Sequence, residues 1–324
     1  MRIAFHGANA ASFVDGFASL LDAAAEITTL PDTLEDPAER RAFAEADIII
    51  GTRLTAAMPL PERVRLYHLP AAGYDGIDFT RLPSDAVVCN CFGHEQAIAE
   101  YVMAALLQRC VPLEDADRRL RRGDWAYWAG APERVHAELG GSTIGLLGFG
   151  HIGRAVAERA RAFGMRVHVA NRSPVAATGL VDRWFSLAEL PAFWPTVDWA
   201  VVSVPLTQQT RGLVGADAFA AMRPDAVLIN VARGPVVDEQ ALYDALAAGR
   251  IGGAVIDTWY RYPTDGEPGP SPGRLPFAEL ANLVMTPHMS GWTRGTIRRR
   301  QATMAANIGR VLRGESCENV IQLP

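Results

Sequence analysis

Lysine is absent from this sequence, because all 31 basic residues of the 324-residue chain are arginine. Its absence excludes a P-loop lysine, a lysine that forms a Schiff base and a lysine general base. The arginines are outnumbered by 36 acidic residues, which leaves a net charge of −5. Nucleic acids and anionic membranes attract basic faces, so we expect neither as a partner.

Long apolar runs and clustered cysteines are also missing. No run approaches the roughly 20 residues of a spanning helix, and the N-terminal stretch 1–10 lacks the apolar core of a signal peptide and is predicted to start with a strand. The chain has four cysteines and no CxxC pair, and no histidine stands at ligand spacing from them. We therefore expect free thiols, no metal and a cytoplasmic location.

The length predicts two domains at roughly 150 residues each. Short β-branched runs alternate with helical stretches, which is typical of parallel α/β proteins. One series of predicted strands lies within 2–90 and a second within 143–286, with a helix near 95–109 between them. A last helix at 293–312 is predicted to return to the first series, which would make that domain discontinuous.

A glycine-rich motif, Gly148-Phe-Gly150-His-Ile-Gly153, follows the apolar run 143–147 and opens a predicted helix. The first glycine suits a tight turn, the second lets a pyrophosphate approach the backbone, and the third lets helix and strand pack closely. Free N–H groups at the helix N-terminus favour the phosphates. We predict dinucleotide binding by Gly148, Gly150, His151, Ile152 and Gly153.

The next predicted strand ends at Asn171-Arg172-Ser173, roughly 20 residues after the glycines. NAD-preferring sites usually carry an acid here, which would repel a 2′-phosphate. Asn171 does not repel it, and Arg172 and Ser173 offer it a cation and a hydroxyl. We favour NADP over NAD; the alternative is that Asn171 holds the ribose of NAD while Arg172 stacks on adenine.

Three later strands are each predicted to end at a chemically active side chain: Arg233, Asp257 and His288. The carboxyl ends of parallel strands border the ligand crevice of a doubly wound sheet, so these groups should converge near the cofactor. Arg233 can hold the carboxylate and carbonyl of a 2-keto acid with its fork of donors. His288 has the pKa range of a general acid or base, and Asp257 could accept from the nicotinamide carboxamide.

Further motifs stand in the same order along the chain: Gly73–Asp78, Ala99–Glu100, Pro205–Thr207 with Thr210, Asn230–Gly234 and Thr286–His288. Together they resemble the D-isomer-specific 2-hydroxyacid dehydrogenases, which include phosphoglycerate, glyoxylate/hydroxypyruvate and formate dehydrogenases. The resemblance implies a Rossmann doubly wound parallel-sheet NAD(P) domain at 94–293. It also implies a flavodoxin-like α/β substrate domain at 1–93 and 294–324, hydride transfer to a small-molecule substrate, and a homodimer.

The resemblance also implies further contacts. On the cofactor side these come from Val204, Pro205, Thr210, Val231, Ala232 and Gly291, together with Arg233, Asp257 and His288. The backbone at Ala72 and Gly73 is expected to hold the substrate carboxylate. Arg53 could reach a second anionic group or be a plain surface residue. His94 could line the substrate site or cap the helix that follows it.

One position departs from the family pattern. Where members usually carry a glutamate bonded to the catalytic histidine, this chain has Tyr262, in a longer loop. We expect Tyr262 to orient a histidine whose pKa stays near about 6.5; the alternative is that Glu267 folds back to replace the acid.

We therefore predict an NAD(P)-dependent 2-keto acid reductase. One alternative is a dehydrogenase for a simple anion such as formate, which needs no proton transfer. Another is a non-catalytic dinucleotide sensor, although a sensor would need neither Arg233 nor His288.

Overall fold

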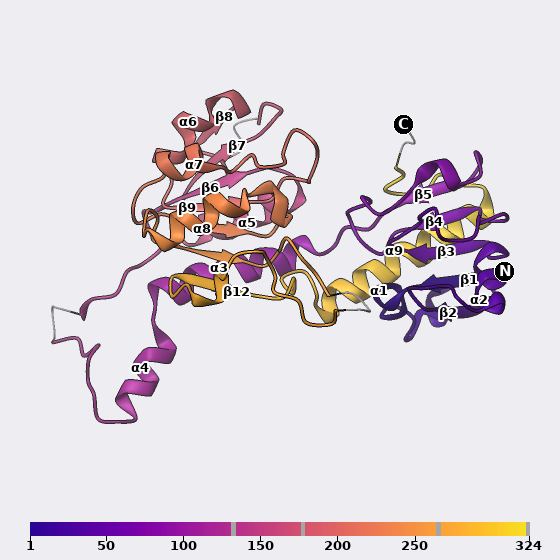
Figure 1. The fold of residues 1–324 in the computed structure, drawn as a ribbon, viewed down its shortest axis with the longest axis horizontal. Coiled ribbons are helices and arrows are strands. Elements are labelled where there is room, and N and C mark those ends of the chain that lie inside the picture. The colour runs from indigo at the N-terminus through magenta and orange to yellow at the C-terminus, as the bar shows by residue number, and fades with distance from the viewer. Residues whose placement is uncertain (131–133, 176–178, 264–266, 322–324) are drawn as a thin grey trace. The chain divides into compact units, whose positions relative to one another are not determined.

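The computed structural model describes residues 1–130, 134–175, 179–263 and 267–321 (Figure 1). The chain forms two compact units, of which the first comprises residues 1–93 and 293–324 and the second residues 94–292. Each unit holds one parallel sheet, which confirms the predicted α/β class.

The first unit is built on a sheet of five parallel strands in the order β2-β1-β3-β4-β5, the order of flavodoxin-like folds. The strands are β1 (Arg2–His6), β2 (Glu26–Leu30), β3 (Ile48–Gly51), β4 (Leu66–His68) and β5 (Val87–Cys89); the helices are α1 (Ala8–Ala11), α2 (Pro37–Ala44) and α9 (Arg294–Arg313). Ile3 and Phe5 pack with Met304 of α9, whereas Ala4 packs on the other face with Phe43 of α2. The C-terminal helix is thus part of this unit's core.

The second unit has seven parallel strands in the order β12-β11-β10-β9-β6-β7-β8. These are β6 (Thr143–Leu147), β7 (Arg166–Ala170), β8 (Arg183–Phe185), β9 (Trp199–Val202), β10 (Val227–Asn230), β11 (Gly253–Ile256) and β12 (Leu283–Met285). The chain winds outward from β6 in one direction and then from β9 in the other. The neighbours β6 and β9 therefore mark the switch point at which doubly wound sheets bind ligands.

Helices cover both faces of this sheet. The covering helices are α3 (Glu95–Cys110), α5 (His151–Ala162), α6 (Leu190–Phe193), α7 (Ala216–Ala221) and α8 (Glu239–Ala247). Helix α4 (Leu113–Leu120) also belongs to this unit but does not cover the sheet. Residues Leu146 and Val201 join the core under α3 and α5, while Leu147 and Val202 join the core under α6, α7 and α8. Strands buried on both faces explain the nearly continuous apolar runs in the sequence.

Both units also contain single turns of 3-10 helix. These lie at Phe17–Leu20, Phe79–Arg81, Leu187–Glu189, Trp194–Thr196, Gly234–Val236 and Phe277–Glu279.

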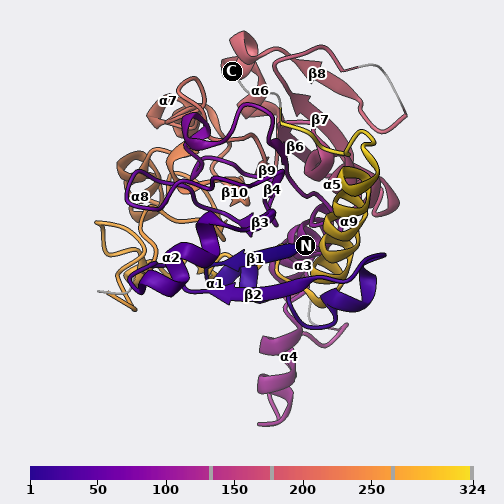
Figure 2. The same cartoon turned by 90° about the vertical axis from the view of Figure 1, so that its right-hand side faces the viewer.

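Helix α4 and strand β8 are among the elements that the sequence did not predict. Helix α4 stands away from the sheet of its own unit (Figures 1 and 2) and buries none of its residues. Ion pairs from Asp115 to Arg119 at 2.6 Å and from Asp117 to Arg121 at 2.8 Å support it instead. Strand β8 is a three-residue edge strand, too short for an alternating pattern to show.

Candidate active site of the second unit

The glycine loop joins β6 to α5, and each glycine meets a different requirement. Gly148 has φ +102°, a conformation that disfavours other residues. A Cβ on Gly153 would lie 2.4 Å from the carbonyl oxygen of Gly148, so helix and loop touch there. A Cβ on Gly150 would meet nothing within 4 Å. The loop therefore leaves open space at the N-terminus of α5, as a bound pyrophosphate requires.

The end of β7 holds the glycine loop in place. The side-chain oxygen of Asn171 accepts a hydrogen bond from the Phe149 N–H at 3.3 Å, and its amide donates to the Ser173 carbonyl at 2.9 Å. Arg172 and Ser173 are exposed. The amide of Asn171 is thus engaged by its own loop, while the Arg172 guanidinium projects into solvent.

The loop after β9 also lies at the switch point. Its predicted cofactor residue Thr210 accepts from the Thr207 N–H at 2.7 Å and donates to the Pro205 carbonyl at 2.6 Å. The threonine pair therefore fixes the shape of this loop, which also contains the predicted cofactor residue Val204.

Arg233 follows β10 in a loop that runs close to the loop after β11. Its Nη1 donates to the Ala232 carbonyl at 2.8 Å. A Cβ at the next residue, Gly234, would lie 2.3 Å from the carbonyl oxygen of Trp259. Glycine is therefore required at position 234 for the two loops to approach, and this approach brings Arg233 toward the loop that carries Tyr262.

Asp257, at the end of β11, is the anchor of the neighbouring loop. It is 0% exposed, and its Oδ1 accepts from the Thr286 hydroxyl at 2.6 Å and from the Met289 N–H at 2.9 Å. Its Oδ2 accepts from the Ser290 N–H at 2.9 Å. The carboxylate thus holds the turn around His288, and a contact with nicotinamide, which stays a prediction, would have to use the acceptor capacity that remains.

His288 is exposed on that turn and has φ +60°, a left-handed conformation that is uncommon outside glycine. Its ring lies 5.6 Å from that of Tyr262, centre to centre, at an interplanar angle of 49°. Partial desolvation and the Arg233 guanidinium lower the pKa of His288, and the Asp257 carboxylate opposes them. The proton of the imidazolium is therefore held less tightly than in a free histidine.

The two candidates for the missing glutamate occupy different surroundings. The Tyr262 hydroxyl accepts from the Trp259 N–H at 3.1 Å, and burial raises its pKa against the effects of that bond and of Arg233. Glu267 forms an exposed ion pair with Arg261 at 2.9 Å. Of the two candidates, Tyr262 therefore lies beside the His288 ring, whereas Glu267 is engaged by Arg261.

The predicted substrate residues divide between the units. In the first unit, Asn90 donates to the Ala72 carbonyl at 2.8 Å and so fixes the loop that continues to Gly73, and Arg53 lies exposed after β3. In the second unit, His94 takes the N-cap position of α3 without a side-chain capping bond, and a Cβ on Gly291 would lie 3.3 Å from the Cβ of His94.

Sequence reasoning missed Tyr101 and Trp259. The Tyr101 hydroxyl lies 2.7 Å from that of Thr286, and the Trp259 indole donates to the Thr286 carbonyl at 2.8 Å. Both residues meet partners far away in the sequence, and no local motif marks them.

Comparison with known proteins identifies the family. The model for the D-isomer specific 2-hydroxyacid dehydrogenase NAD-binding domain matches residues 103–290, more than half of the chain. The chain belongs to the D-isomer specific 2-hydroxyacid dehydrogenase family. The predicted oxidoreductase class, NAD(P) cofactor and hydride transfer to a 2-keto acid are confirmed at this level.

Individual relatives include reductases of small 2-keto acids. Glyoxylate/hydroxypyruvate reductase B of Salmonella typhi is 30% identical over 312 residues, 93% of each chain. D-3-phosphoglycerate dehydrogenase of Methanocaldococcus jannaschii is 30% identical over 296 residues, which cover 86% of this chain but 52% of that protein. An NADPH-dependent glyoxylate/hydroxypyruvate reductase of Sinorhizobium meliloti, solved with NADP and malonate, has a TM-score of 0.77 at 26% identity and covers 99% of this chain and 96% of that one.

The described residues form neither a metal site nor a membrane-spanning helix. No three His, Cys, Asp or Glu side chains there come together as metal ligands would. Within the same residues, every helix is too short or too polar to cross a bilayer.

Proposed function

We propose that this chain reduces a small 2-keto acid with NADPH. Arg233 binds the carboxylate and the carbonyl oxygen, and His288 donates the proton to the alkoxide that forms as hydride arrives. The observation that carries this proposal is the Asp257-anchored turn, which presents His288 next to Arg233 at the strand ends. The cofactor supplies the hydride when it is bound.

The residues that would hold the cofactor are those of the glycine loop and the end of β7. The open space at Gly150 accommodates the pyrophosphate, and the exposed Arg172 is available to a 2′-phosphate. The S. meliloti relative is NADPH-dependent, which supports the same preference. We assign the substrate role to the first unit, with the backbone at Ala72 and Gly73 and the side chain of Arg53 contacting the acid; in the second unit, His94 is a further candidate for substrate contact.

The test is NADPH and NADH oxidation with glyoxylate, hydroxypyruvate, phenylpyruvate and oxaloacetate, with formate and NAD(P)⁺ as the reverse control. We expect turnover of at least one keto acid, and we expect Arg233→Ala to remove it, while Arg121→Ala on the exposed α4 has no effect. Formate oxidation in place of keto acid reduction would favour the simple-anion alternative. Cofactor binding without any turnover would favour the dinucleotide sensor.

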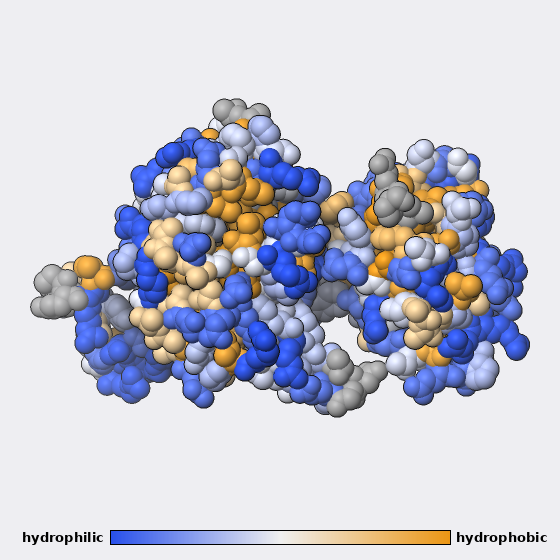
Figure 3. All heavy atoms as spheres, turned by 45° about the horizontal axis from the view of Figure 1, so that its top comes forward, coloured by the Kyte–Doolittle hydropathy of each residue, from blue (hydrophilic) through white to orange (hydrophobic). Residues whose placement is uncertain are grey.

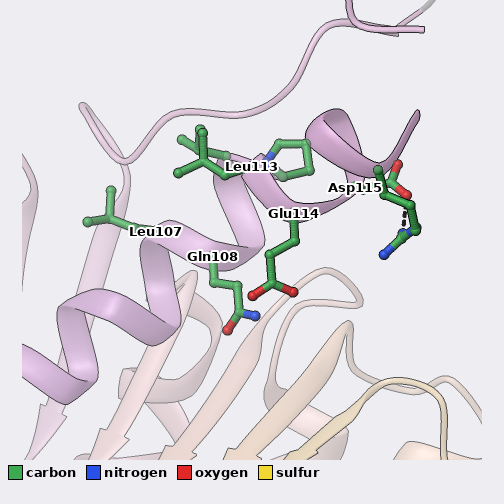
Figure 4. A pocket seen from close by; sticks show the side chains of 8 residues that line it. Leu107, Gln108, Leu113, Glu114 and Asp115 are labelled. Atoms are coloured by element: carbon green, nitrogen blue, oxygen red, sulfur yellow. Dashed lines mark hydrogen bonds and ion pairs between the residues drawn. The ribbon is translucent and has the colours of Figure 1, made fainter. Parts of the chain in front are cut away.

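We further propose a cytoplasmic homodimer that associates through the second unit. The four cysteines are free, in keeping with a reducing compartment. On the face shown in Figure 3, exposed apolar residues lie among the hydrophilic ones. In the second unit, the side chains of Leu113 in α4 and of Trp125 are 73% and 66% exposed. A pocket of about 530 Å³ opens at the bend between α3 and α4, where Leu107 and Leu113 lie (Figure 4). An apolar patch of this kind suits a second copy of the chain.

Sedimentation velocity tests the dimer. We expect a dimer for the wild type and a monomer for the combined Leu113→Asp and Trp125→Ala variant. A wild-type monomer at micromolar concentration would contradict the proposal.

A further inference from the structure

The backbone at His288 needs support from its surroundings. A non-glycine residue at φ +60° is strained, and such strain persists only where neighbouring contacts fix it. The N–H groups of Met289 and Ser290, which follow His288 directly, both donate to Asp257. The position of the His288 ring therefore depends on how firmly Asp257 is held.

Asp257 is held in turn by the Thr286 hydroxyl, which itself lies next to the Tyr101 hydroxyl, and the proton positions of both hydroxyls can be assigned. An ionised carboxylate only accepts, so the Thr286 hydroxyl donates to Asp257 across 2.6 Å. That uses the only proton of the threonine hydroxyl. The Tyr101 hydroxyl, 2.7 Å away, must then donate to Thr286.

This relay links helix α3 to the ends of β11 and β12. Burial raises the pKa of Tyr101 to about 12, more than its bond to Thr286 lowers it, so the phenol stays a proton donor at any working pH. The Thr286 carbonyl is fixed separately by the Trp259 indole at 2.8 Å. Removing the threonine hydroxyl would therefore loosen Asp257 while leaving the backbone of Thr286 tied.

We propose that Tyr101 and Thr286 are positioning residues for the reduction, because their hydroxyl relay to Asp257 fixes the turn that presents His288. The proposal rests on the proposed role of His288 as proton donor. Both residues act on His288 through Asp257.

The decisive variants are Thr286→Val, which keeps the shape and removes the hydroxyl, and Thr286→Ser, which keeps the hydroxyl. We expect Thr286→Val to lower kcat about 10- to 100-fold, the effect of losing a hydrogen bond to a charged group. The Kd for NADPH should change much less than kcat, because the glycine loop and the end of β7, which are expected to bind most of the cofactor, stay intact. Thr286→Ser should retain most of kcat, as should Thr303→Val, which removes a threonine hydroxyl on α9. A kcat of Thr286→Val at the wild-type level, or equal damage in both Thr286 variants, would overturn the proposal.

A double-mutant cycle keeps the proposal testable if Thr286→Val folds poorly. Tyr101→Phe alone should reduce kcat by a few-fold, but it should cause no further loss when the Thr286 hydroxyl is already gone. If the fold-losses in kcat of the two single variants instead multiply in the double variant, the two hydroxyls act independently and the relay is refuted.

The pKa of His288, followed by NMR, separates this proposal from the proposed function. The groups facing the ring are Tyr262, Arg233 and Asp257, and Asp257 is the one that favours its protonation. A loosened Asp257 should therefore lower the pKa of His288 in Thr286→Val but not in Thr286→Ser. No shift in Thr286→Val refutes the relay even if no keto acid is turned over, whereas wild-type turnover that survives His288→Asn refutes only the proposed function.

Discussion

The glycine loop after β6 and the strand ends of β10, β11 and β12 lie on the same edge of one sheet, yet they are built differently. The loop is shaped by backbone and by missing side chains: Gly153 lets α5 touch the loop, and Gly150 leaves open space. The strand ends are shaped by hydrogen bonds between side chains and backbone, centred on the buried Asp257. A site made from backbone shows itself in glycine spacing, whereas a site made from side-chain bonds depends on partners that only the fold brings together.

The largest contrast should come from two alanine substitutions in the glycine loop. Gly153→Ala places a Cβ 2.4 Å from a backbone oxygen and should cost about 1–3 kcal/mol of unfolding free energy. Gly150→Ala meets no protein atom, so the melting temperature should hold while the Kd for NADPH rises at least about tenfold. Thermal melts and cofactor titrations on both variants decide this. Equal losses of stability would contradict the distinct roles of the two glycines.

The preference for NADPH over NADH tests the role of Arg172 at the end of β7. Arg172→Ala should lower kcat/KM for NADPH about 10- to 100-fold, the effect of one lost charge-assisted hydrogen bond, and leave NADH almost unchanged. Arg121→Ala serves as the control for removing an exposed arginine. A parallel fall with both cofactors would mean that Arg172 stacks on adenine instead.

The pH dependence of reduction tests how the residues at the strand ends set the pKa of His288. Reduction needs the imidazolium, so kcat/KM should fall as pH rises through the pKa of His288, which lies below about 6.5 because desolvation and Arg233 lower it. Tyr262→Glu should move this midpoint upward by about one unit or more, since a carboxylate stabilises the charged ring. Tyr262→Phe, the matched control, should leave it in place. An unmoved midpoint in the glutamate variant would show that position 262 does not act on His288.

The smallest effect is expected at Glu267. Its exposed ion pair with Arg261 should contribute less than about 1 kcal/mol, and Glu267→Gln should not shift the pH profile. A downward shift of a full unit in that variant would make Glu267 the replacement for the missing acid.

The sequence was sufficient for most of the fold because parallel strands buried on both faces leave unmistakable apolar runs. The apolar run 143–147 is strand β6 as predicted, and β11 ends directly before Asp257. Helix α4 escaped prediction because it is only eight residues long and mostly charged, and it buries none of its residues.

For the site, the predictable part was the residue that ends each strand. Arg233, Asp257 and His288 follow β10, β11 and β12, so topology alone brings them to one edge. The relay from Tyr101 was out of reach because its hydroxyl meets Thr286 across 185 positions of sequence. The φ of +60° at His288 could not be predicted either, because a positive φ is usually indicated by a glycine and this position is a histidine.

The most direct test of the central claim compares chemistry with cofactor binding in His288→Asn. If the strand ends carry out the proton transfer and the glycine loop binds the cofactor, kcat for the best keto acid falls about 10²- to 10⁴-fold while the Kd for NADPH stays within about twofold. Wild-type kcat in this variant, or a loss of NADPH affinity as large as the loss of kcat, would contradict that division of labour.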